Sequence, residues 1–246
     1  MTLRGAPLVV LLLGGGALAG CSGSDESPAL VRPIPAPAAA PERAAPGPAP
    51  VSARLARTTM LRDAPGGKML TRLTRRTEFD GETVLAVARR EQGWLGVRTH
   101  ERPNGKLGWI PADAARLESQ PYRLRIDLSR RELVVVDNGD GKLVRRAPVA
   151  IGAPGTPTPT GNFGVTDRIE PKTDTGPYGC CILALSGRQP NLPQGWGGGD
   201  RLAIHATSNE ASVGSPASSG CLRATEETMR ELMKLVPLGA PVEIVR

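Results

Sequence analysis

Aromatic side chains are scarce in this sequence. Three Trp, two Tyr and two Phe are spread over 246 residues, so the chain offers few rings on which unpaired bases could stack. The net charge of +7 therefore does not indicate a single-stranded nucleic-acid platform, and we expect no nucleic-acid partner. Cysteine is also rare, with four residues, which excludes a small scaffold held together by disulfides. The fold must depend on the packing of aliphatic side chains.

The first 21 residues have the layout of a secretory signal. Arg4 is the only charge before Asp25, and it precedes the apolar run 8–13 and the small residues that lead to Cys21. The run is too short to span a membrane, which takes about 20 apolar residues. Because Cys21 directly follows Leu-Ala-Gly, the segment resembles a bacterial lipoprotein signal, in which this cysteine is lipid-modified and becomes the new N-terminus. The alternative is an ordinary signal peptide cut near Ala19.

Lipidation of Cys21 would anchor the protein to the outer face of the cytoplasmic membrane, in the cell-wall zone. Residues 22–52 are the expected linker. Eight Pro and eight Ala fall between Ser22 and Pro50, and a segment of this composition cannot bury a core. In polyproline geometry, at about 3.1 Å per residue, the linker would reach on the order of 90 Å. It would carry a globular unit from the membrane into a wall layer.

Residues 53–118 are expected to form a small β-barrel. Short apolar runs such as 94–97 and 108–111 alternate with turns rich in Gly and Pro. These runs resemble those of bacterial SH3-like modules, which often accompany cell-wall enzymes. The stretch 51–120 holds 13 basic and 8 acidic residues, so most of the basic excess lies here. It indicates either a solvated basic face or a surface that attracts anionic wall polymer or lipid headgroups.

Residues 121–246 are expected to form a second unit that is mostly β with one short helix. The run 124–128 alternates apolar and polar residues, as a half-buried strand does, and the turn residues at 137–141 predict a hairpin. The helix is expected over 225–235, where Thr225 can cap the first turn. The predicted fold class is thus mostly β.

His205 and Cys221 are the two residues that indicate catalysis. His205 ends an apolar strand, and Cys221 follows sixteen residues later in the motif SSGCLR. Gly220 lets the backbone turn sharply, so the N–H groups of Ser219, Gly220 and Cys221 can point into one concavity and hold an oxyanion. Beside these donors and His205, we expect the pKa of the thiol to be lowered. Arg223 would emerge on the same face as Cys221.

The motifs around these residues resemble the signature of L,D-transpeptidase catalytic domains. They are HATSN at 205–209 and SSGCLR at 218–223, supported upstream by TPTGNFGV at 158–165, GPYG at 176–179 and GGGD at 197–200. The resemblance covers about 125 residues, essentially 121–246. It implies a β-sandwich of the L,D-transpeptidase type, placed after the SH3-like barrel.

The resemblance makes Cys221 the nucleophile and His205 its base. The backbone carbonyl of Ala206 would orient the imidazole, and Arg223 would support the loop or the substrate. Two positions depart from the commonest pattern, because Ala206 stands where Gly or Ser is frequent and Ser219 where His is frequent. Both contribute mainly backbone groups, so the chemistry survives, whereas substrate preference on the Ser219 side is open.

The implied reaction is acyl transfer on peptidoglycan stem peptides, without a cofactor or a metal. Cys221 would attack the carbonyl of the diamino residue at stem position three, release the terminal D-Ala and form a thioester. An amine from a neighbouring stem would give a 3→3 cross-link, whereas water would give hydrolysis, as in an L,D-carboxypeptidase. The resemblance also implies acylation by carbapenem-type β-lactams.

Other interpretations fit the sequence less well. Papain-like thiol hydrolases place the cysteine before the histidine in the chain, and sortases separate the two by far more than sixteen residues. A zinc site made of His205, Cys221 and the pair Cys180-Cys181 lacks the usual ligand spacing. A non-catalytic, tethered wall-binding lipoprotein is the remaining alternative, and the joint presence of His205, Gly220, Cys221 and Arg223 argues against it.

Cys180-Cys181 is the least informative feature. In a strand the two side chains would point to opposite faces, so we expect two free thiols. A bridge between neighbouring cysteines is disfavoured because it strains the geometry. His100 is expected to have no role beyond the small barrel.

Overall fold

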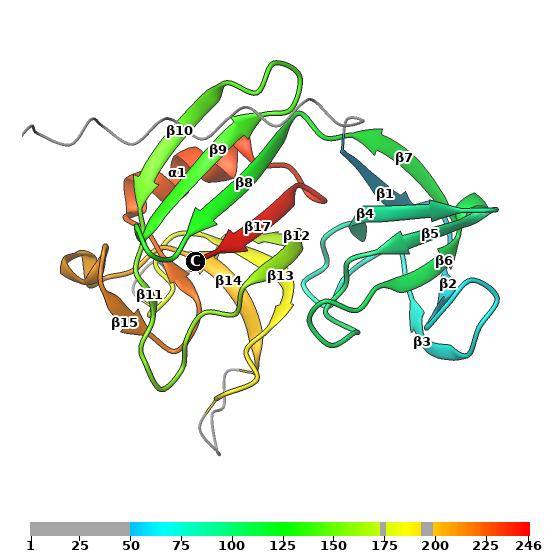
Figure 1. Ribbon diagram of the computed structural model, residues 1–246, viewed down its shortest axis with the longest axis horizontal. Helices are drawn as coiled ribbons and strands as arrows, with labels where there is room; N and C mark the ends of the chain where they lie inside the picture. Colours follow the sequence, from blue (N-terminus) through cyan, green and yellow to red (C-terminus); the bar gives the residue numbers. More distant parts are fainter. Residues whose placement is uncertain (1–49, 173–175, 193–198) are drawn as a thin grey trace, which may run out of the picture. The chain divides into compact units, whose positions relative to one another are not determined.

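The computed structural model describes residues 50–172, 176–192 and 199–246, which fold mostly into β-strands (Figure 1). From residue 50 onward these residues belong to one compact unit. The expectation of a mostly β fold with one short helix is confirmed. In this part of the chain no helix is long and apolar enough to cross a membrane. The predicted signal peptide and Cys21 lie outside the described residues, as does the linker up to residue 49.

The N-terminal sheet has seven strands, all paired antiparallel, in the order β3-β2-β6-β5-β4-β1-β7. Leu61, Leu95, Val97 and Ile110 are buried in its core. A Cβ at position 108 would lie 2.4 Å from a methyl group of Leu61, so glycine leaves the room that this core side chain fills. The bounds of these elements are β1 (Val51–Leu55), β2 (Thr59–Arg62), β3 (Met69–Leu73), β4 (Val84–Glu91), β5 (Trp94–Val97), β6 (Gly108–Pro111), the 3₁₀ turn η1 (Ala112–Ala114) and β7 (Ala115–Ser119).

The second sheet is mixed and has eight strands, in the order β10-β9-β8-β17-β12-β13-β14-β16. Two pairs are parallel, β8 with β17 and β14 with β16, and the others are antiparallel. A small parallel pair, β11 with β15, stands apart. The bounds are β8 (Tyr122–Asp127), β9 (Glu132–Asp137), β10 (Leu143–Pro148), β11 (Ile151–Gly152), β12 (Gly161–Ile169), β13 (Ile182–Arg188), β14 (Arg201–His205), η2 (Glu210–Ser212), β15 (Pro216–Ser218), β16 (Leu222–Arg223) and β17 (Pro241–Val245).

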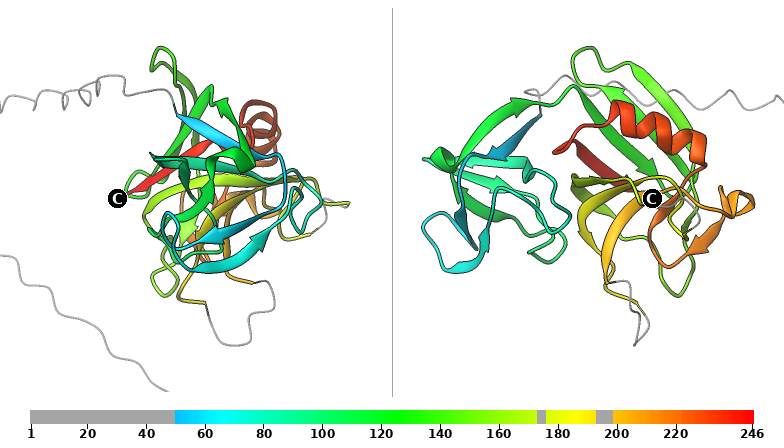
Figure 2. Two further views of the ribbon diagram at one scale, coloured as in Figure 1. Left: turned by 90° about the vertical axis from the view of Figure 1, so that its right-hand side faces the viewer. Right: turned by 180° about the vertical axis from the view of Figure 1, so that it is seen from behind.

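Helix α1 (Glu226–Leu235) packs on the face of the second sheet, beside β8, β9 and β10 (Figure 2). Thr225 caps it as predicted, because its hydroxyl accepts the N–H of Thr228 at 3.2 Å. The helix buries Met229, Leu232 and Met233 in the core that also holds Leu124 and Val135. Each large apolar side chain buried in this way contributes about 1.5–3 kcal/mol. The predicted hairpin turn is also present, between β9 and β10.

Strand β12 of the second sheet contacts strand β4 of the N-terminal sheet. A Cβ at Gly164 would come within 2.6 Å of the Ala86 Cβ, so glycine permits the close approach of the two strands. The guanidinium of Arg98 donates to the carbonyl of Asn162 at 2.8 Å across the same contact. The N-terminal sheet is therefore held directly against the sheet that carries the candidate site.

Candidate active site

The parallel pairing of β14 with β16 brings the two predicted catalytic residues together. His205 ends β14, and Cys221 immediately precedes β16, whose Arg223 pairs with His205 in the register. Both residues line a cavity of about 360 Å³. The pairing of β14 with β16 thus brings together two residues that are sixteen positions apart in the sequence. The other lining residues are Phe79, Ile169, Pro177, Tyr178, Ile182, Ala184, Gln189, Leu192, Gly199, Arg201, Leu202, Ala203, Ser218, Ser219 and Arg223.

His205 is buried, with 3% of its surface exposed, and has a defined tautomer. Its Nδ1 lies 2.6 Å from the carbonyl oxygen of Ala206. Because a carbonyl only accepts, Nδ1 carries the proton and Nε2 keeps its lone pair. Burial lowers the pKa of His205 to about 4, the Ala206 carbonyl raises it in part, and the charge of Arg223 lowers it further. At neutral pH the imidazole is therefore uncharged and able to accept a proton.

Tyr178 packs against this imidazole from the turn that precedes β13. The two ring centroids are 4.9 Å apart, with the rings at 78°, which is an edge-to-face contact. Together with the Ala206 carbonyl, this contact restricts the rotation of the His205 ring. Tyr178 belongs to the GPYG motif that supported the family resemblance.

The environment of Cys221 differs from the expectation in one respect. Burial raises the pKa of its thiol, and the nearby backbone of Ala203 and the charge of Arg223 lower it only in part. The expected lowering of this pKa is therefore wrong, because desolvation outweighs the favourable donors. The Sγ–H is directed at the carbonyl of Arg201, at 3.7 Å. The resting pair is a neutral thiol beside a neutral imidazole.

The backbone around Gly220 forms a tight turn that only glycine fits. Its φ of +118° is strained for other residues, and a Cβ there would lie 2.1 Å from Nε2 of Gln189. Ser218 braces the turn, since its hydroxyl donates to the Cys221 carbonyl at 2.5 Å and accepts the Gly220 N–H at 3.1 Å. In this structure the Gly220 N–H therefore already has a partner, the Ser218 hydroxyl. The N–H groups of Ser219 and Cys221 have no hydrogen-bond partner among the described residues.

Two buried side chains, Gln189 and Thr158, hold this turn through hydrogen bonds to its backbone. Nε2 of Gln189 lies 3.2, 2.9 and 3.3 Å from the carbonyl oxygens of Thr156, Pro157 and Ser219. The hydroxyl of Thr158 donates to the Gly220 carbonyl at 2.8 Å. Thr158 begins the TPTGNFGV motif, so its position at least was marked, whereas Gln189 belongs to no motif in the sequence.

Arg223 lies where it was expected, at the wall of the cavity. Its charge lowers the pKa of both His205 and Cys221, so it favours the neutral imidazole and the thiolate alike. Its Nε is buried without a hydrogen-bond partner in the described part of the protein.

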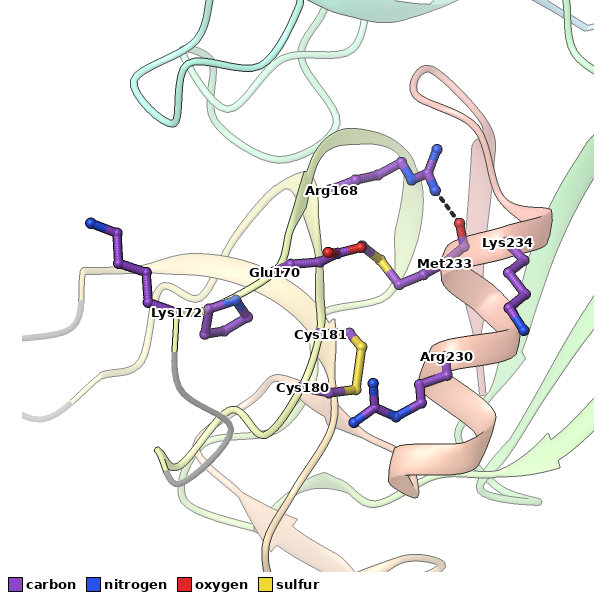
Figure 3. A pocket seen from close by; sticks show the side chains of 9 residues that line it. Arg168, Glu170, Lys172, Cys180, Cys181, Arg230, Met233 and Lys234 are labelled. Atoms are coloured by element: carbon purple, nitrogen blue, oxygen red, sulfur yellow. Dashed lines mark hydrogen bonds between the residues drawn. A yellow bond between two sulfur atoms is a disulfide. The ribbon is translucent and has the colours of Figure 1, made fainter.

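Cys180 and Cys181 are bonded to each other, so the expectation of two free thiols is wrong (Figure 3). They lie in the turn before β13, which begins at Ile182, so the strand geometry that would separate their side chains does not apply. The disulfide lines an open pocket of about 660 Å³ next to α1. The Cys181 carbonyl accepts the N–H of Ala206 at 3.1 Å, which links this turn to the residue that orients His205.

Known proteins are similar to the second half of this chain. The model of the L,D-transpeptidase catalytic domain (YkuD) matches residues 121–244. A Bacillus licheniformis protein named "Putative L,D-transpeptidase YkuD" is 35% identical over 124 residues, which cover 50% of this chain and 66% of that protein. The protein of the same name from Bacillus subtilis is 32% identical over 126 residues, covering 51% and 67%. The matches thus span about two thirds of these relatives.

A solved structure is also similar. It is L,D-transpeptidase 3 from Mycobacterium tuberculosis in complex with a faropenem-derived adduct, with 16% identity and a TM-score of 0.40, covering 57% of this chain and 73% of that one. The family match covers half of the chain and contains the cavity residues of the second sheet. The chain belongs to the L,D-transpeptidase catalytic-domain (YkuD) family.

Proposed function

We propose that the protein is a peptidoglycan L,D-transpeptidase that forms 3→3 cross-links through an acyl-enzyme on Cys221. One observation carries the proposal. The buried imidazole of His205 holds its only proton on Nδ1, against the Ala206 carbonyl, in the same cavity as the protonated thiol. A neutral pair of this kind reacts by general-base catalysis, with the proton moving as the sulfur attacks.

In the first step, Sγ of Cys221 attacks the carbonyl carbon of the residue at stem position three. The thiol proton passes to Nε2 of His205, and the carbonyl electrons move onto the oxygen. As the tetrahedral intermediate collapses, the bond to the terminal D-Ala breaks and the imidazolium returns its proton to the leaving amine. The products are a thioester on Cys221 and free D-Ala.

The oxyanion of this intermediate would be held by the backbone N–H groups of Ser219 and Cys221. Neither group has a partner in the described structure, and the Gly220 turn fixes both. The loss of one such donor costs enzymes about 2.7–4 kcal/mol of transition-state stabilisation. The Arg223 charge stabilises the same negative charge as it develops, which is consistent with its effect on the pKa of Cys221.

In the second step, the side-chain amine of a neighbouring stem attacks the thioester. His205 accepts a proton from that amine and delivers it to the departing Cys221 sulfur, so the resting pair is restored. Water in place of the amine would give a tripeptide, which is the carboxypeptidase outcome. Product analysis with a tetrapeptide donor and an amine-bearing acceptor separates the two, because only transfer yields a dimer.

Trapping with a carbapenem tests the nucleophile. Opening of the β-lactam ring by Cys221 would leave a stable adduct, which intact-protein mass spectrometry detects as one added mass. The Cys221→Ala variant should form none, whereas Ser219→Ala, which keeps the backbone N–H, should still form it. The same adduct on Cys221→Ala would refute the proposal.

We further propose a location for this activity. A lipid on Cys21 would anchor the chain outside the cytoplasmic membrane, and the basic excess over 51–120 supports attraction of an SH3-like N-terminal unit to anionic wall polymer. Cys21→Ala should release the protein from the membrane fraction, and continued membrane association would count against lipidation. Deletion of 53–118 should weaken binding to isolated wall sacculi, and unchanged binding would remove that role.

A further inference from the structure

The N-terminal sheet contributes a side chain to the wall of the catalytic cavity. Phe79, from the loop between β3 and β4, lines the cavity that holds His205 and Cys221. Its side chain is half exposed, at 51%, in a chain with only two phenylalanines. A large apolar side chain placed at the rim of a cavity is suited to contact a ligand.

The loop that presents Phe79 is closed by its own hydrogen bonds. The N–H of Thr77 donates to the Gly81 carbonyl at 2.8 Å, and the N–H of Asp80 donates to the Thr77 carbonyl at 3.1 Å. The hydroxyl of Thr77 accepts the N–H of Phe79 at 3.3 Å. Asp80 has a positive φ of 61°, which turns the chain directly after Phe79. The aromatic ring is thus carried at the tip of a defined turn.

Arg201 connects this loop to the nucleophile. Its guanidinium lies 5.7 Å from the centroid of the Phe79 ring and forms an ion pair with Glu78. The other side of the guanidinium donates to the buried carboxylate of Asp167 at 2.7 Å. The backbone carbonyl of the same Arg201 accepts the Sγ–H of Cys221. The loop and the thiol are therefore fixed to one residue of β14.

Further contacts fix the N-terminal sheet near the cavity. Asn104 and Arg188 form a reciprocal pair, in which the Asn104 amide donates to the Arg188 carbonyl at 2.7 Å and accepts its N–H at 2.8 Å. The Arg188 guanidinium also donates to the carbonyl of His100 at 2.6 Å. His100, which we expected to have no role beyond the small barrel, therefore takes part in this contact. The position of Phe79 is set by several independent contacts and not by one flexible side chain.

We propose that Phe79 is a specificity-determining residue of the catalytic cavity. Its ring covers the aliphatic part of the peptide whose carbonyl Cys221 attacks, in a cavity that Ile169, Ile182 and Leu202 also line. The ligand class is a short peptide with aliphatic side chains, and the inference rests on the proposed function. The N-terminal unit then selects substrate in addition to any role in wall targeting.

The test compares Phe79→Ala with Leu117→Ala in the full chain kept in detergent. Leu117 is an exposed apolar residue of the same sheet, in β7, and does not line the cavity. The release of D-Ala from a defined tetrapeptide gives KM and kcat. Phe79→Ala should raise KM about tenfold with kcat within about twofold, because a binding contact is lost and the chemistry is not. Leu117→Ala should leave both unchanged, and Phe79→Leu should restore most of the affinity.

Equilibrium binding separates this inference from the proposed function. Binding of the same tetrapeptide to Cys221→Ser, with and without Phe79→Ala, is measured by calorimetry, and the second change should weaken it about tenfold. If the peptide binds in this manner but the unchanged chain releases no D-Ala, the proposed function fails and the role of Phe79 stands. Equal affinity in the two variants, or no peptide binding at all, overturns the role of Phe79. Alkylation of Cys221 by iodoacetamide should be the same in Phe79→Ala, which confirms that the nucleophile is undisturbed.

Discussion

Replacement of Gly220 by alanine tests the physical basis of the nucleophile turn. A Cβ at this position would approach Nε2 of Gln189 to 2.1 Å, and the φ of +118° would become strained. Gly214→Ala is the matched control. Gly214 also has a positive φ, of +84°, but a Cβ added there would have no atom of the described residues within 4 Å. Both substitutions strain the backbone, and only the one at Gly220 also brings a Cβ against Gln189.

The expected loss of unfolding free energy depends on the hydrogen bonds that the Gln189 amide would lose. An alanine in a glycine-type conformation costs about 1–3 kcal/mol, which applies to both variants. The Gln189 amide has two hydrogens shared among three carbonyls, so its displacement removes about two hydrogen bonds, or about 2 kcal/mol. Gly220→Ala should therefore cost about 2 kcal/mol more unfolding free energy than Gly214→Ala.

Urea denaturation of both variants gives these differences, provided that the m-values are equal. Gln189→Ala removes the obstacle, so the double variant Gly220→Ala with Gln189→Ala should be about 2 kcal/mol more stable than the sum of the single effects predicts. Equal costs for Gly220→Ala and Gly214→Ala, or strict additivity in the cycle, would refute the reasoning about Gln189.

Three further predictions concern titration and oxidation. Because burial lowers the folded-state pKa of His205 to about 4, the unfolded state binds more protons between pH 4 and 6.5, and stability should rise with pH in that window. By urea denaturation the gain should be about 3 kcal/mol and should be missing in His205→Asn; an equal gain in the variant would contradict the assignment. Arg223→Gln should raise the pKa of Cys221 further, so its alkylation by iodoacetamide should require higher pH; an unchanged rate profile would show that the charge does not act on the thiol. Peptide mapping should find the tryptic peptide 173–188 alkylated on both cysteines only after reduction, and alkylation without reductant would exclude the disulfide.

The sequence predicted the candidate catalytic residues because each is marked by its neighbours in the chain. His205 ends a strand and Cys221 follows a glycine turn. Parallel pairing of β14 with β16 is then enough to bring the two residues together. The helix cap at Thr225 and the hairpin turn at 137–141 were predictable for the same reason, since each depends on a few neighbouring residues. Local patterns therefore determined the elements and the identity of the candidate nucleophile and base.

Properties that depend on burial were not predictable from these patterns. The motif suggests a lowered pKa for Cys221, but the direction is set by desolvation inside the folded cavity, which raises it. Gln189 contacts Ser219 across 30 residues without any local signal, and Arg201 meets Glu78 across 123. The bond between Cys180 and Cys181 was disfavoured because a bridge between neighbouring cysteines strains the geometry. The two side chains were also expected on opposite faces of a strand, where the structure has a turn.

The most direct test of the central claim is to trap the acyl-enzyme on the peptide substrate. The full chain in detergent is mixed with a defined tetrapeptide stem, quenched in acid and digested with trypsin, and the peptide 202–223, which contains Cys221 and His205, is weighed. This peptide should carry the stem tripeptide as a thioester on Cys221, free D-Ala should appear with it, and Cys221→Ala should show neither. A thioester elsewhere in the chain, or D-Ala release that survives Cys221→Ala, would contradict it.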